Sequence, residues 1–261
     1  LRSLGRDGPS IIPDWRNKEA ELTAVAVMGV LAEVTGVRAT VAHVSNPAAA
    51  QLIQEARARG ADLAAEACPQ YFLLREDEVL DKGALRKFTP PARAQSDADE
   101  AQMWDLLRSR VLTHVSSDHA PATLDQKSEG SIWDVHFGLP GLDTTGSMLF
   151  DAALRGILSF EEVVRVYSEN PARRYGLYPR KGHLGAGADA DVVLFDPTGT
   201  RTLEDSEIIS KAGWTPYAGR AVRGRIVGTW QRGVRIATDG RLDEGLHGRF
   251  LPGAGSREQH A

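Results

Sequence analysis

Residues 37–74 constrain the fold most, because two strand-like segments there flank a single helix. The first segment is VRATVAHVS, a β-branched run that ends at Ser45, and the second is a short apolar strand within ADLAAEACPQYFLL. Between them lies NPAAAQLIQEARARG, with Asn46 as N-cap, Pro47 at the first helical position and Gly60 at its end. A strand, a helix and a strand within roughly thirty residues form a βαβ unit, so we expect parallel strands.

The alternation continues along the chain. Acidic first turns and apolar residues at spacings of three and four predict helices at 17–36, 97–110, near 143–156 and at 159–170, and a strand is expected at 111–118. This order predicts an α/β layer fold with helices on both faces of the sheet. After Gly182 the predicted secondary structure changes, because residues 188–196 and 222–241 have the pattern of short strands joined by Gly and Asp-Gly turns.

The composition excludes several classes of function. With 42% hydrophobic and 25% charged residues and a net charge of −4, the chain gives no electrostatic reason to expect nucleic acid or an anionic membrane as a partner. No apolar run approaches the length that spans a bilayer. The only cysteine, Cys68, excludes an intrachain disulfide and favours a reducing, cytoplasmic location.

Polar side chains follow the predicted strands where parallel α/β folds bind ligands. His43 can simply bond a neighbouring loop, and Asp118 can simply cap the next segment. Taken together, an imidazole and a carboxylate suit zinc, although a catalytic zinc usually has three protein ligands. Side chains alternate along a strand, so Asp118 and His119 are expected to face opposite sides. We interpret Lys87 and Lys127 as solvated or structural residues.

Several motifs, in chain order, resemble one known family. They are VAHVSN, EACPQYFLL, KFTPPAR, SSDHAPATLDQK and ENPARRYGLYPRKGHLGAGADADVVLFDP. They are similar to the second half of the cyclic amidohydrolases, that is hydantoinase/dihydropyrimidinase, allantoinase and dihydroorotase, over roughly residues 1–241. The resemblance implies the C-terminal part of a (β/α)8 TIM-like barrel, strands six to eight, at 1–180. It also implies the C-terminal part of a β-sandwich at 181–245, and we expect a disordered tail at 246–261.

The resemblance also implies a chemistry, namely hydrolysis of an amide bond in a small ring such as a hydantoin, dihydropyrimidine, allantoin or dihydroorotate. The family uses a two-metal centre, usually zinc, bridged by a carboxylated lysine and a hydroxide that attacks the ring. By the match of motifs, the resemblance implies that His43 and Asp118 are metal ligands and that Asp118 is also the catalytic general base. Thr89 and Gly138 match positions that contact the substrate.

The family's remaining ligands are a His-x-His pair, a lysine and a further histidine, and the sequence contains no His-x-His. We therefore expect that the chain is N-terminally truncated and inactive alone. In the full-length parent we expect hydrolase activity and a homo-oligomer, either a dimer or a tetramer. The alternative is a non-enzymatic scaffold protein related to dihydropyrimidinase. Ala122 stands where dihydroorotases usually carry a histidine, which counts against that subfamily.

Overall fold

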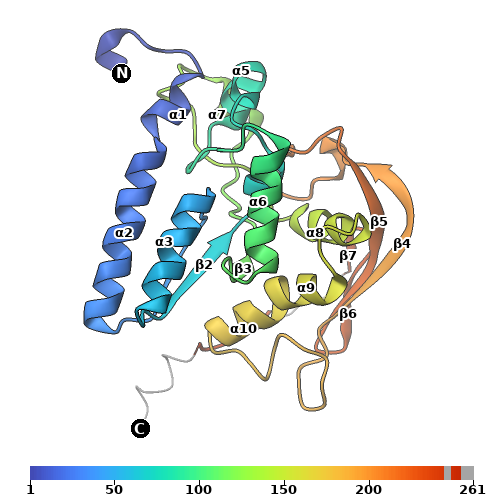
Figure 1. The fold of residues 1–261 in the computed structure, drawn as a ribbon. Helices are drawn as coiled ribbons and strands as arrows, with labels where there is room; N and C mark the ends of the chain where they lie inside the picture. Colours follow the sequence, from blue (N-terminus) through green and yellow to red (C-terminus); the bar gives the residue numbers. More distant parts are fainter. Residues whose placement is uncertain (244–247, 254–261) are drawn as a thin grey trace. The chain divides into compact units, whose positions relative to one another are not determined.

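The computed structural model describes residues 1–243 and 248–253. It divides into two compact units. The first unit comprises residues 1–145 and 204–219, and the second comprises residues 146–203 together with the chain from residue 220 onward. Figure 1 shows the course of the chain through both units.

The first unit contains a parallel sheet of three strands, in the order β1 (Ala39–Val41), β2 (Leu63–Ala67) and β3 (His114–Val115). Ala39 pairs with Leu63, and Glu66 pairs with His114. The parallel strands expected from the βαβ pattern are thus confirmed. All three strands end toward the same edge of the sheet, which is where functional side chains of such folds gather.

Three long helices alternate with these strands: α2 (Lys18–Thr35), α3 (Pro47–Ala58) and α6 (Asp97–Arg108). Each is capped by a side chain just before its first residue, because Asn17, Asn46 and Ser96 accept hydrogen bonds from backbone N–H groups in the first turn. Figure 1 shows α2 and α3 side by side. The shorter elements of this unit are η1 (Arg2–Leu4), α1 (Ile11–Trp15), α4 (Gln70–Leu73), α5 (Glu78–Lys82), η2 (Gly83–Arg86), α7 (Leu124–Ser128) and η4 (Asp205–Glu207).

The core of the first unit consists of apolar side chains from α3, α4 and α6. Ile53 and Leu107 are fully buried, and the rings of Phe72 and Trp104 stack with their centroids 4.4 Å apart. This packing holds the helices against the sheet and fixes the direction in which each strand end points.

The second unit combines a helical segment with an antiparallel sheet. The helices are α8 (Thr145–Leu154), α9 (Phe160–Val164), the π-helical turn η3 (Arg165–Glu169) and α10 (Asn170–Arg174). The sheet runs in the order β4 (Val192–Thr202), β5 (Ala221–Gln231), β6 (Val234–Thr238) and β7 (Arg241–Leu242). Asp239 and Gly240 both have positive φ, as the tight hairpin between β6 and β7 requires.

The expected helices and strands are present, with small differences. The strand expected at 111–118 contains only two strand residues, and the strand at 188–196 extends to Thr202. The compact units divide the chain differently from the predicted domain boundary at residue 180, because helices from 146 onward group with the antiparallel sheet. The domain assignment remains a prediction. Most of the tail predicted at 246–261 lies outside the described residues.

Candidate functional site

Three polar residues follow the three parallel strands of the first unit. His43 comes two residues after β1, Gln70 three residues after β2 and Asp118 three residues after β3. His43 and Asp118 both adopt positive φ, at 42° and 45°. Such a backbone is uncommon outside glycine, although Asp and His tolerate it better than most residues. Strained backbone of this kind is concentrated at functional sites, which makes these two turns the leading candidates in the first unit.

The carboxylate of Asp118 is held by a neighbouring amide. Nε2 of the buried Gln70 donates a hydrogen bond of 2.8 Å to Oδ2 of Asp118. Burial raises the pKa of Asp118 above its ordinary value, and the nearby Glu66 carboxylate adds to that rise, while the His43 imidazole acts to lower it. The structure therefore brings the predicted pair His43 and Asp118 within electrostatic reach of each other.

A second polar cluster lies beneath this pair, on β2 and β3. Ser116 Oγ donates to Glu66 Oε1 at 2.8 Å, and His114 Nε2 lies 3.6 Å from Glu66 Oε2. Burial acts to raise the pKa of Glu66, but the contacts with His114 and Ser116 outweigh it and leave that pKa below its ordinary value. Only the pairing of β2 with β3 reveals these partners of Glu66.

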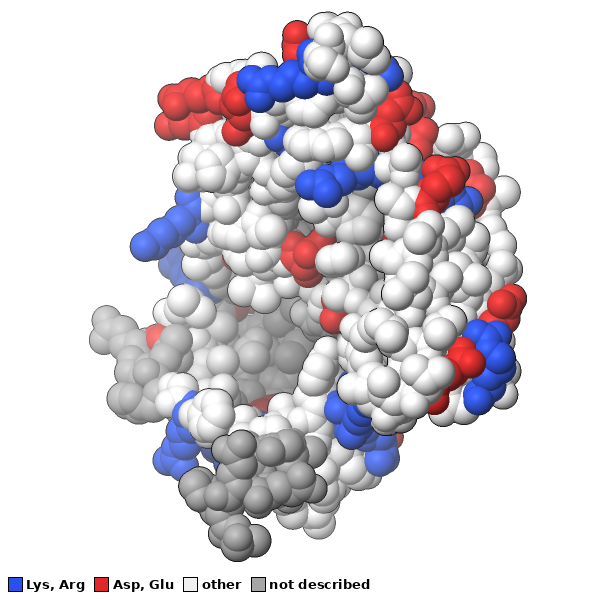
Figure 2. Space-filling model, turned by 90° about the vertical axis from the view of Figure 1, so that its left-hand side faces the viewer, with Lys and Arg blue, Asp and Glu red and all other residues white. Residues whose placement is uncertain are grey.

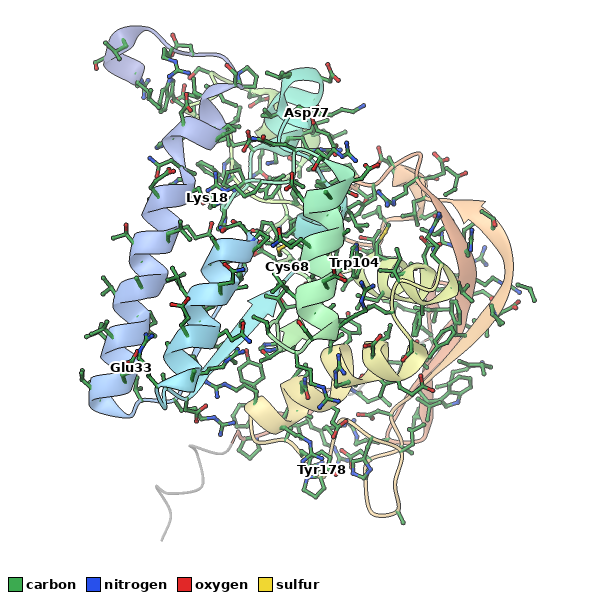
Figure 3. All side chains as sticks on the ribbon, viewed as in Figure 1. Lys18, Glu33, Cys68, Asp77, Trp104 and Tyr178 are labelled. Atoms are coloured by element: carbon green, nitrogen blue, oxygen red, sulfur yellow. The ribbon has the colours of Figure 1, made fainter. Side chains whose placement is uncertain are left out.

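Cys68 adjoins the same cluster. Its thiol is fully buried just after β2, with Sγ 3.5 Å from Ser116 Oγ. Figure 3 labels the position of Cys68 in the fold. Burial raises the pKa of the Cys68 thiol well above its ordinary value. A neutral, buried thiol is a poor nucleophile, so this cysteine is a packing residue of the site's floor.

The two predicted substrate contacts lie in different surroundings. Thr89 is exposed and, with His43, lines a groove of about 330 Å³ between α2 and β1. Gly138 is buried with φ of 107°, and a Cβ there would lie 2.3 Å from the Ala120 carbonyl oxygen, so only glycine fits. The N–H of Gly138 donates to the Lys87 carbonyl. The roles of Thr89 and Gly138 remain predictions.

The neighbours Asp118 and His119 have separate partners, as expected. His119 Nδ1 accepts hydrogen bonds from the N–H groups of Gly141 and Leu142, at 3.2 and 3.1 Å. His119 thus fixes the loop after β3, while Asp118 faces Gln70.

Two buried lysines support the loops around the site, Lys87 and Lys127. They are 1% and 2% exposed, so of the two expected interpretations, solvated or structural, the structural one applies. Lys127 Nζ donates to the carbonyls of Lys87 and His136 at 2.9 and 3.0 Å. Lys87 Nζ donates to the carbonyl of Val135. Burial lowers the pKa of Lys127 to about 7, with a further contribution from Lys87.

The residues present do not by themselves complete a metal site. Nowhere in residues 1–243 or 248–253 do three or more His, Cys, Asp or Glu side chains form a group that could hold a metal ion. His43 and Asp118 offer two donors, whereas a catalytic zinc usually takes three from the protein. A metal centre here therefore requires donors beyond those described.

Comparison with known proteins identifies the family. Residues 13–236, most of the chain, match the amidohydrolase family. The chain belongs to that family. This amidohydrolase chain is 33% identical over 233 residues to an allantoinase of Rubrobacter xylanophilus, with 89% of the chain matched. It is 36% identical over 235 residues to a dihydroorotase of Halobacterium salinarum, with 87% matched. The matches cover 51% and 53% of those relatives, so the chain spans about half their length.

Solved structures agree with this assignment. A D-hydantoinase (dihydropyrimidinase) from Thermus sp. superimposes with a TM-score of 0.88 at 26% identity, over 93% of this chain and 54% of that protein. An L-hydantoinase (dihydropyrimidinase) from Arthrobacter aurescens gives a TM-score of 0.80 at 30% identity, over 88% and 50%. The predicted resemblance to cyclic amidohydrolases is thereby confirmed. The described part of the chain contains no helix long and apolar enough to cross a membrane.

Proposed function

We propose that this amidohydrolase chain carries the proton-transfer half of a site that hydrolyses the amide bond of a small cyclic amide. The observation that carries the proposal is the Asp118 carboxylate, half-buried three residues past the end of β3, held by Gln70 and within electrostatic reach of His43. The relatives named allantoinase, dihydroorotase and hydantoinase support a ring of the allantoin, dihydroorotate, hydantoin or dihydropyrimidine type.

Asp118 is the group that moves the proton. Its raised pKa makes the carboxylate a better proton acceptor than an ordinary aspartate, which suits it to take a proton from the attacking water. The new C–O bond forms as that proton moves to Asp118, and the same proton then passes to the ring nitrogen as the C–N bond breaks. Gln70 holds one carboxylate oxygen, Oδ2, which leaves Oδ1 for the proton transfer in this proposal.

Zinc is the expected metal, and when bound it would polarise the carbonyl and lower the pKa of water. His43 and Asp118 are the donors that this chain would contribute. The remaining donors would come from outside the described residues. In this proposal the three parallel strands are barrel strands six to eight, and the antiparallel sheet is part of a β-sandwich. Retention of both His43 and Asp118 disfavours the scaffold alternative.

The proposal is tested by complementation. Residues 1–261 alone, with zinc, are expected to hydrolyse none of hydantoin, dihydrouracil, allantoin and dihydroorotate. Co-expression with the part of the Rubrobacter xylanophilus allantoinase that lies outside the match is expected to supply the remaining donors and to give activity on one of these rings.

Asp118→Asn in that preparation should lower kcat by at least roughly a hundredfold, because the proton carrier is lost. Asp125→Asn, an exposed acid on α7, is the matched control and should leave kcat unchanged. A preparation that stays inactive on all four rings, or an Asp118→Asn variant that keeps its rate, would contradict the proposal.

A further inference from the structure

The two segments that carry the predicted substrate contacts meet at one carbonyl oxygen. Thr89 follows Lys87 by two residues, and Gly138 lies in the segment after α7. The N–H of Gly138 donates to the Lys87 carbonyl at 3.0 Å. Nζ of Lys127, on α7, donates to the same oxygen at 2.9 Å. The Lys87 carbonyl therefore ties both segments to each other and to α7.

Further hydrogen bonds hold the second of these segments along its length. Nζ of Lys127 also donates to the His136 carbonyl at 3.0 Å, and the His136 N–H donates to the carbonyl of Gln126 on α7 at 3.2 Å. Nζ of Lys87 donates to the Val135 carbonyl. We call Lys127 Nζ and its two acceptors, the carbonyls of Lys87 and His136, the lysine clamp.

The clamped segment lies directly against the turn that carries Asp118. A Cβ on Gly138 would lie 2.3 Å from the Ala120 carbonyl oxygen, so the two backbones are in close contact there. The N–H of Ala120 donates to the Leu139 carbonyl at 3.0 Å. A shift of Gly138 would therefore change what lies beside the Asp118 turn, while the hydrogen bond from Gln70 to the Asp118 carboxylate stays in place.

Packing alone does not account for two buried lysines. No described carboxylate forms an ion pair with the ammonium group of Lys87 or Lys127, and their other neighbours are the rings of Phe137 and Trp214, with centroids 4.4 and 6.0 Å from the respective Nζ atoms. On the face seen in Figure 2, by contrast, charged side chains of both signs reach the surface beside one another. Because burying an unpaired cation costs free energy, an apolar side chain of similar size would often be at least as stable. What an apolar side chain cannot do is fix two backbone carbonyls.

We propose that Lys127 is a positioning residue for substrate binding, which holds the predicted contacts Gly138 and Thr89 in the one arrangement beside Asp118 that fits the ring. This inference rests on the proposed function, and it assigns Lys127 to binding of the cyclic amide rather than to proton transfer. Lys127 is buried and bonded to two backbone carbonyls, so it acts on the substrate through the segments that it holds.

The first experiment measures KM and kcat in the co-expressed preparation described above. Lys127→Met should raise KM for the hydrolysed ring at least about tenfold and change kcat less than about threefold, because binding common to the ground and transition states is lost. Lys82→Met, at an exposed lysine of α5, is the matched control and should change neither value more than about twofold. A variant that is merely misfolded would lower kcat at an unchanged KM, because fewer sites would be active.

The second experiment needs no catalysis and follows hydrogen exchange of single backbone amides by NMR in residues 1–261 alone. In Lys127→Met the Gly138 N–H should exchange at least about tenfold faster, because its segment has lost the clamp. The Thr113 N–H, which donates to the Ala65 carbonyl between β3 and β2, should exchange no faster than in the unchanged chain. Lys82→Met should leave both amides unchanged.

An unchanged KM in Lys127→Met, or a Gly138 N–H that exchanges no faster there, would overturn the inference while the proposed function stands. A lower kcat at unchanged KM, or faster exchange of Thr113 as well as Gly138, would show a general structural role and overturn it too. An unchanged preparation that hydrolyses none of the four rings would overturn the proposed function and, with it, the substrate role of Lys127. The exchange of Gly138 would then decide on the clamp alone.

Discussion

At the scale of single residues, backbone conformation distinguishes the candidate site from its neighbours. Strand alternation predicts that Asp118 and His119 face opposite sides, and they do have separate partners. The reason differs from the prediction, however, because β3 ends at Val115 and Asp118 sits in a turn with φ of 45°. The turn, rather than the pleat, directs the Asp118 carboxylate toward Gln70.

Replacing Asp118 should reveal this backbone strain. Asn tolerates positive φ, so Asp118→Asn should stay close to the unchanged chain in its free energy of unfolding. Asp118→Val should be less stable than Asp118→Asn by about 1–3 kcal/mol, because a β-branched residue is strained there. Urea unfolding measures the difference. The same pair of changes at Asp125, within α7, should differ by less than about 0.7 kcal/mol, and an equal difference at both sites would contradict the strain argument.

Lys127 should make stability depend on pH. Its pKa is about 7 in the folded chain against 10.5 for an ordinary lysine. Between pH 7 and pH 10.5 the unfolded chain binds the Lys127 proton more readily than the folded chain, so the free energy of unfolding rises with pH. Below about pH 7 Lys127 is protonated in both states, and its full destabilising effect is present. The difference in free energy of unfolding between the unchanged chain and Lys127→Met should increase by up to about 1.4 kcal/mol per pH unit between pH 7 and 9.

Comparing with Lys127→Met removes the opposing effect of Cys68. The pKa of that buried thiol is raised, so it makes stability fall at alkaline pH in both proteins alike. Lys82→Met, at an exposed lysine of α5, is the control and should leave the pH dependence unchanged. If the Lys127→Met difference is flat from pH 7 to 9, Lys127 stays charged in the folded chain.

At the scale of elements, the helices were the most predictable part. Their ends could be read from capping residues, and the helix expected at 17–36 is α2, from Lys18 to Thr35. The helix expected at 159–170 continues through the π-helical turn η3 into α10, where Pro171 occupies the first turn. Periodicity cannot locate a π-helical turn. Such a turn contains one residue more than an α-helical turn, and whether it forms depends on the packing of the helix segments before and after it.

Gly29 tests how closely α2 and α3 approach. An added Cβ would lie 3.2 Å from the Ala56 side chain, so Gly29→Val should overpack the contact and lower the free energy of unfolding by about 1–3 kcal/mol. Ala26→Val, exposed on the same helix, provides a matched control and should cost less than about 1 kcal/mol. Thermal unfolding of both variants makes the comparison. A larger loss for Ala26→Val would show that α2 and α3 are not in close contact.

At the scale of the whole molecule, the chain spans about half the length of its relatives. No group of three or more His, Cys, Asp or Glu side chains in the described residues could hold a metal ion, and the proposed site has only the two donors His43 and Asp118. Zinc should therefore bind residues 1–261 weakly.

The expected result is that added zinc changes the free energy of unfolding of residues 1–261 by much less than about 2.7 kcal/mol, the gain at a hundredfold excess over the dissociation constant. Urea unfolding with zinc, and with a chelator in its place, measures this. A gain of that size that disappears in His43→Asn and in Asp118→Asn would show that these two donors suffice, and the expectation would be wrong.

The parallel α/β order, the capped helices and the family can all be read from the amino-acid sequence. Local signals carry all of these: periodicity, N-caps and contiguous motifs around His43 and Asp118. Tertiary pairing alone brings Glu66 against His114 and Ser116 and buries Lys87 and Lys127. Each of these depends on which strands and helices become neighbours, and pairing between distant segments leaves no periodic signal in a single sequence.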